Sequence, residues 1–135
     1  MRRRAHRAAQ PLGCLTTMAD KLSRGERATL RELAATAHEQ ELETALTDLY
    51  EQFCKWGGDG ISAFDLNDEI HNFHDGISRE LYRTYVMNKP EVAVSIGIAR
   101  GIIDIQELDE NLREKIAPMV DAFQSKDGAD EEDAT

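Results

Sequence analysis

Apolar residues recur every three or four positions along residues 24–56, and this long stripe is the feature that most constrains the fold. Its members are Leu30, Leu33, Ala34, Ala37, Leu42, Ala45, Leu46, Leu49, Phe53 and Trp56. Such spacing places side chains on one face of an α-helix, which turns once in about 3.6 residues. The stripe predicts one amphipathic helix over 24–56. Residues 36–39 also fit a capping-box pattern, so a break there stays open.

Four polar signatures mark where the predicted helices begin. They start at Ser23, Ser62, Asn88 and Asp104. In each, a short polar side chain can accept a hydrogen bond from a free backbone N–H at the helix start. At the two serines and the aspartate, an acid three residues later completes a capping box. The glycine-rich run 57–60 ends the first helix, because glycine readily adopts the left-handed conformations of helix ends.

Two further segments carry helical stripes. One runs from Ser62 to about Met87, and the other starts at Asp104 and contains Pro118, which we expect to kink or end the helix. Their apolar members are Leu66, Ile70, Phe73, Ile77, Leu81 and Tyr85 in the first, and Leu108, Leu112, Ile116, Met119, Val120 and Phe123 in the second. Both stripes keep a helical period, so both predict amphipathic helices.

Residues 92–103 are ambiguous, because their first half alternates between apolar and small residues as a strand does. No other segment alternates in this way, so a strand here would have no partner. Pro90 in the preceding signature suits the first turn of a helix. We therefore predict a short buried helix in which Ser95, Gly97 and Ala99 allow a close neighbour. Gly76, inside the second stripe, is likewise expected to allow close helix packing.

The predicted fold is all-α, an irregular bundle of four to five amphipathic helices that forms a single domain over residues 21–124. Residues 1–20 are expected to be a disordered basic arm, and Met18 is an alternative start of translation. A targeting peptide and a nucleic-acid-binding arm are the other interpretations of this segment. Residues 125–135 carry five acids and are expected to be a disordered tail.

The charge of the chain excludes some partners. The formal net charge is −10, and the first 17 residues hold four arginines and no acid, which leaves −14 for the rest. Such an acidic domain repels nucleic-acid phosphates. The sequence contains no apolar run of the ~18–20 residues that a membrane span needs. The partners that remain are another protein or a second copy.

The two cysteines, Cys14 and Cys54, are too few for a disulfide-rich secreted domain, so we expect reduced thiols and a cytoplasmic protein. Cys54 falls on the apolar stripe and is predicted to be a core thiol. Near the middle of the same helix, His38, Glu39, Glu41 and Glu43 are expected to form an ordinary solvated face.

One helix face concentrates reactive side chains. Its candidate metal ligands are His71, His74, Asp75 and Asp68, and Arg79 and Tyr82 are candidate pocket residues beside them. Imidazole and carboxylate groups three and four residues apart on a helix can bind a transition metal. A bland alternative makes the histidines edge residues of the core and pairs Asp75 with Arg79 on the surface. Further ligands would have to come from another helix.

No complete catalytic set occurs in the sequence, so an enzyme is the less favoured class. The first hypothesis is a non-enzymatic protein-interaction or oligomerisation module, with a homodimer as one form. The alternative is a metal-binding helical protein that uses the His71 and His74 face. No other cofactor is predicted.

Overall fold

Helices account for nearly all of the residues that the structure describes. The computed structural model describes residues 22–134, with side chains over 22–126, and no strand occurs within this range. The helices are α2 (Arg24–Gly57), α3 (Ala63–Phe73), α4 (Arg79–Tyr82), α5 (Pro90–Ala99) and α6 (Glu110–Ala134). Two π-helical turns, His74–Ser78 and Arg83–Met87, flank α4, and a 3-10 turn, Ile105–Glu107, precedes α6. The all-α bundle is confirmed. The basic segment 1–20, with Met18 and Cys14, lies outside the described residues.

Helix α2 is one uninterrupted helix of 34 residues, so the capping pattern at 36–39 does not break it. Its start is the predicted capping box. The Ser23 hydroxyl accepts from the Glu26 N–H at 3.0 Å, and the Ser23 N–H donates to the Glu26 carboxylate at 2.9 Å. Glu26 also accepts from Lys115 at 2.8 Å and from Asn111 at 3.0 Å, so the same carboxylate ties α2 to α6.

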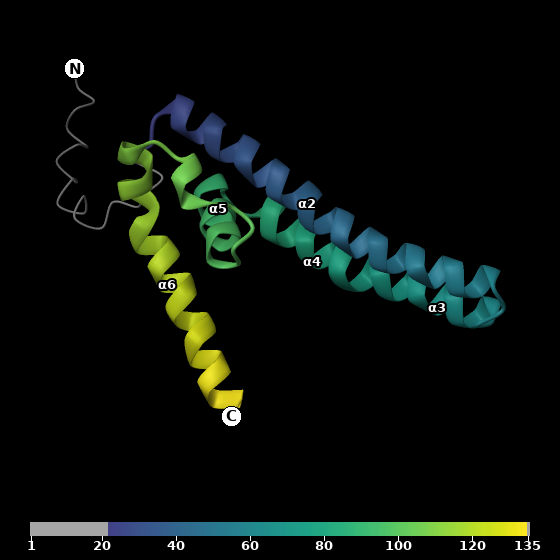
Figure 1. The fold of residues 1–135 in the computed structure, drawn as a ribbon. Coiled ribbons are helices and arrows are strands. Elements are labelled where there is room, and N and C mark those ends of the chain that lie inside the picture. Colours follow the sequence, from purple (N-terminus) through teal and green to yellow (C-terminus); the bar gives the residue numbers. More distant parts are fainter. Residues whose placement is uncertain (1–21, 135) are drawn as a thin grey trace, which may run out of the picture.

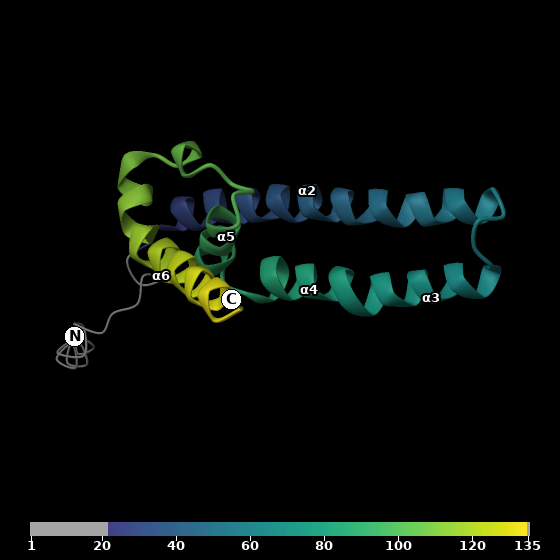
Figure 2. The same cartoon turned by 60° about the horizontal axis from the view of Figure 1, so that its bottom comes forward.

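The chain then turns back and forms a hairpin of helices. The turn after α2 contains Asp59 in the left-handed conformation (φ 64°), and Ser62 caps α3 by accepting from the Asp65 N–H at 3.0 Å. From α3 to the end of α4 the chain runs antiparallel to α2 (Figure 1). Figure 2 shows α5 and α6 gathered at the N-terminal half of α2, far from this turn. We call residues 45–77, the free end of the hairpin, the arm; this segment is distinct from the predicted basic arm of residues 1–20.

The buried core lies at the opposite end from the arm. It unites the first half of α2, the second π-helical turn, α5 and the first half of α6, and its fully buried members include Leu30, Leu112 and Ile116. The cluster consists of Leu22, Leu30, Ala34, Ala37, Leu81, Tyr85, Ala93, Val94, Ile98, Ile103, Leu108, Leu112, Ile116 and Val120. No described residue between Ala37 and Leu81 belongs to it. Within the arm, only Ala45 and Leu66 are buried.

Two of the four predicted helix starts are placed differently. Asn88 does not cap α5: the cap is Lys89, without a side-chain hydrogen bond, and the Asn88 amide instead donates to the Thr84 carbonyl at 3.0 Å. The Asp104 capping box is present, but it opens only the short 3-10 turn. Helix α6 begins later, where the Asp109 carboxylate accepts from the Leu112 N–H at 2.8 Å. The helix predicted over 92–103 is confirmed in part: α5 spans Pro90–Ala99, and residues 100–103 are not helical.

Two further expectations differ from the structure. Cys54 is exposed and not a core thiol, because it lies nine residues, or two and a half turns, from buried Ala45 and so on the opposite side of α2. The sequence predicts a disordered tail over residues 125–135, but the backbone of residues 125–134 continues α6. No proline interrupts this stretch, and Pro118 lies inside the helix without ending it. No helix of residues 22–134 is both long and apolar enough to cross a membrane.

The two internal helical glycines have different surroundings. A Cβ at Gly97 would lie 2.6 Å from Ile103 Cδ1 and 3.5 Å from the Tyr85 hydroxyl, so this glycine does permit a close approach. A Cβ at Gly76 would meet no heavy atom within 4 Å. The expected close packing at Gly76 is therefore wrong, because the outer side of this helix has no neighbour.

This contrast predicts opposite effects for the same substitution. Gly76→Ala should raise the free energy of unfolding by about 0.5–1 kcal/mol, because alanine restricts the unfolded chain and meets nothing in the fold. Gly97→Ala should lower it by about 1–3 kcal/mol, since the buried Ile103 side chain must move. Urea denaturation of the two variants measures both values. Equal effects at the two positions would contradict the packing described here.

Candidate functional site

The arm exposes an unusual amount of apolar surface. Seven of its large apolar side chains are exposed, by fractions from 38% at Ile70 to 83% at Phe64. They are Leu46, Tyr50, Phe53, Trp56, Phe64, Ile70 and Ile77. Scattered exposed apolar residues are normal on soluble proteins, but a contiguous apolar patch marks an interaction site.

On α2 these side chains form a continuous stripe. Leu46, Tyr50 and Phe53 follow at intervals of four and three residues, so they share one face of the helix. Leu46 and Phe53 belong to the apolar stripe that the sequence predicts over 24–56, whereas Tyr50 is not part of that prediction. The stripe is exposed because, within the arm, α2 packs against α3 and the π-helical turn after it, while α5 and α6 lie at the other end of α2 (Figures 1 and 2).

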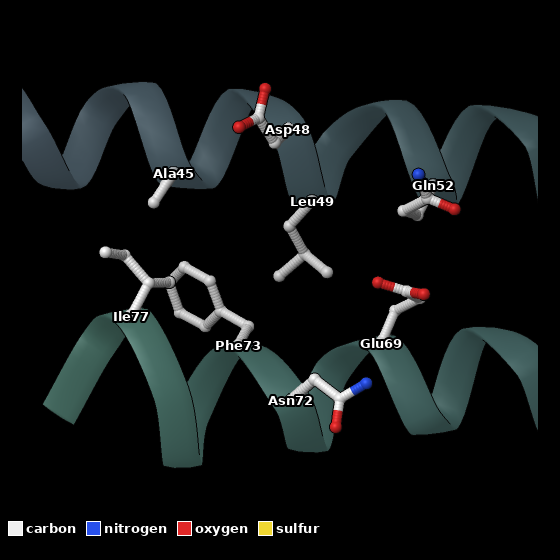
Figure 3. Close-up of a pocket in the computed structure, with 8 residues that line it drawn as sticks. All are labelled: Ala45, Asp48, Leu49, Gln52, Glu69, Asn72, Phe73 and Ile77. Atoms are coloured by element: carbon white, nitrogen blue, oxygen red, sulfur yellow. The ribbon is translucent and has the colours of Figure 1, made fainter. Parts of the chain in front are cut away.

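A groove runs between α2 and α3 on the arm (Figure 3). Its apolar floor combines Ala45 and Leu49 of α2 with Phe73 and Ile77 of the facing chain, and these side chains point toward one another across the gap. The volume of this open groove is about 310 Å³. Polar side chains form the rest of the lining: Asp48, Gln52, Glu69 and Asn72.

The arm is strongly acidic around this groove. Residues 45–77 contain seven acidic side chains and a single basic one, Lys55, which gives a formal charge of −6. The acids are Asp48, Glu51, Asp59, Asp65, Asp68, Glu69 and Asp75. An apolar surface within such a field attracts cationic partners and repels anionic ones.

The structure brings together some of the residues that the sequence singles out. His74, Arg79 and Tyr82 line one shallow depression together with Ser78, with a volume of about 300 Å³. Arg79 pairs with Asp75 at 3.4 Å between exposed side chains, as the surface-pair interpretation expects.

Asp68 and His71 are exposed and do not line this depression. Among the described residues, no three His, Cys, Asp or Glu side chains are grouped so that they could hold one metal ion. The metal-site hypothesis stays a prediction.

A polar cluster joins the hairpin to the core, and the sequence does not reveal it. The half-buried carboxylate of Glu41 accepts from the Tyr85 hydroxyl and from Arg100 at 3.0 Å. The imidazole of His38 stacks on Tyr85 with ring centroids 5.7 Å apart. Glu41 is therefore not part of a merely solvated face. Its partners are 44 and 59 residues away in the chain, so no local pattern indicates them.

The same cluster perturbs one titration. Burial of the phenol, and its hydrogen bond to the Glu41 carboxylate, raise the pKa of Tyr85 well above its ordinary value. The neutral phenol is therefore favoured in the folded state.

Comparison with known proteins gives no identification. No family model, curated protein or solved structure matches this chain. The functional argument therefore depends on the geometry described above.

The Glu41 cluster predicts a stability difference between two glutamates of one helix. Glu41→Ala should lower the free energy of unfolding by about 1–3 kcal/mol, because it leaves the buried Tyr85 hydroxyl without its acceptor. Glu43→Ala changes the charge equally at an exposed position and should stay within about 0.5 kcal/mol of wild type. Urea denaturation compares the two, and equal losses would show that the cluster contributes nothing.

The raised pKa of Tyr85 predicts a pH dependence. The folded-state pKa of Tyr85 exceeds the unfolded value of about 10. The contribution of its neutral phenol to the free energy of unfolding is therefore fully present below pH ~10 and is lost as the pH rises further. The stability of wild type relative to Tyr85→Phe should therefore fall above pH ~10, by up to about 1.4 kcal/mol per pH unit. Denaturation of both proteins across this range measures the difference. A constant difference would contradict the prediction.

Proposed function

We propose that this chain is a non-enzymatic protein-interaction module that contacts its partner through the arm. The observation that carries the proposal is the exposure of seven large apolar side chains on a two-helix extension that stands away from the core. Removing apolar surface from water contributes roughly 25 cal/mol per Å² of favourable free energy, so covering these side chains would favour binding of a partner.

Helix packing supports the same proposal. Two packed helices bury only the side chains between them, whereas three or four helices enclose a core. The arm has the two-helix part of such an arrangement, with the groove on Leu49 and Phe73 and the stripe on Tyr50 and Phe53 both open to further helices. A partner protein or a second copy could supply them.

The proposed compartment is the cytoplasm. The thiol of Cys54 is free and exposed on α2. Exposed free thiols persist where the surroundings are reducing, which fits a cytoplasmic interaction.

The proposal predicts that association depends on the arm. We expect wild type to form a defined complex, with itself or with a partner retained from native extract, and Tyr50→Gln/Phe53→Gln to lose it. Both side chains are exposed, by 67% and 39%, so the double variant should keep its melting temperature. Size-exclusion chromatography with light scattering, together with pull-down, measures the association.

The matched control is Val86→Gln/Met87→Gln, which replaces two exposed apolar residues outside the arm. This control should associate as wild type does. A strict monomer that retains no partner would overturn the proposal, as would an association that the arm variant leaves intact.

A further inference from the structure

The groove between α2 and α3 has the dimensions of a helix-binding site. On its α2 side, the groove is lined by Ala45, Leu49 and Gln52, at intervals of four and three residues. The seven steps from Ala45 to Gln52 rise by about 10 Å, or two helical turns. A helix laid along the groove presents apolar side chains at the same intervals and over the same length.

The floor of the groove is apolar and incompletely covered. Ala45 is buried, Leu49 and Phe73 are half-buried, and Ile77 is 41% exposed. Figure 3 shows the four side chains converging on one space between the two helices. A few aliphatic side chains from an added helix would fill this space and shield the floor from water.

The two walls of the groove each carry a carboxylate. Asp48 lies on α2 and Glu69 lies on α3, and both are exposed. Gln52 and Asn72 complete the polar lining without adding charge. A helix seated on the floor would therefore place its flanking residues beside one carboxylate on either side. Lysine and arginine are the flanking residues that suit this position.

We propose that this groove binds an amphipathic helix of a different protein, with an apolar face and Lys or Arg along its flanks. This inference rests on the proposed interaction function and names the partner's chemistry. The arm's formal charge of −6 favours approach of a cationic helix and disfavours a second copy. In a symmetric pairing of two such grooves, Asp48 and Glu69 would face the same carboxylates of the other copy.

Two labelled peptides test the proposal on the full-length protein. Both have the same helix-forming length and the same apolar residues at positions i, i+4 and i+7, and they differ only in flanking Lys or flanking Glu. Fluorescence anisotropy measures their affinities. We expect the Lys-flanked peptide to bind at least about tenfold more tightly, and this ratio to narrow as salt is added.

Charge-reversal variants locate the site. Asp48→Lys/Glu69→Lys should remove or invert the preference for the Lys-flanked peptide. The matched control, Glu51→Lys/Asp68→Lys, makes the same change in net charge on the same two helices, at exposed residues outside the groove lining. It should keep the preference. All four positions are exposed, so circular dichroism should show folded protein in both variants.

Several results would overturn the inference: equal affinity for the two peptides, no binding of either, or a preference that the groove variant retains. A dimer of wild type that the Lys-flanked peptide does not dissociate and that buries the groove would also overturn it, in favour of a second copy. If the peptides fail but association still depends on Tyr50 and Phe53, only this partner is wrong. If association is also independent of them, the proposed function falls as well.

Discussion

Helix α2 is longer than the core that supports it, and the rest of the structure depends on this mismatch. Its 34 residues extend for about 50 Å, whereas α5, which packs beside it, has 10 residues. Helix α5 is too short to reach the second half of α2, and α6 runs away from it (Figure 1), so both helices lie at the first half. The second half packs against α3 and the π-helical turn that follows it, so this half of α2 is buried on one side and open to water on the other.

The two halves of the molecule depend on each other at one polar joint. Tyr85 belongs to the buried cluster, and its hydroxyl donates to Glu41 where α2 leaves the core. Arg100, just after α5, reaches the same carboxylate. The joint therefore ties α2 to the end of the returning chain and to the residue after α5. The second π-helical turn, Arg83–Met87, contains Tyr85 and so is part of this joint.

The candidate surface could be predicted only in part. His74, Arg79 and Tyr82 do line one depression. Arg79 and Tyr82 are three residues apart and share one helical face. His74 lies five residues before Arg79, a spacing that suits the π-helical turn over His74–Ser78. The groove could not be predicted from the sequence, because Leu49 and Phe73 follow the same apolar periodicity as Leu30 and Leu112 of the core. Periodicity shows that a face is apolar and does not show what covers it.

The sequence by itself determined that the chain is helical and where the Ser23 and Ser62 capping boxes start α2 and α3, because these features depend on contacts within about four residues. Tertiary structure alone decided which apolar residues are buried. Leu30 is covered and Leu46 is 45% exposed, although both lie on the same predicted stripe. The sequence likewise predicts a core position for Cys54 and a solvated one for Glu41, and both predictions are wrong. Their surroundings come from segments distant in the chain, and local periodicity contains no information about where those segments end.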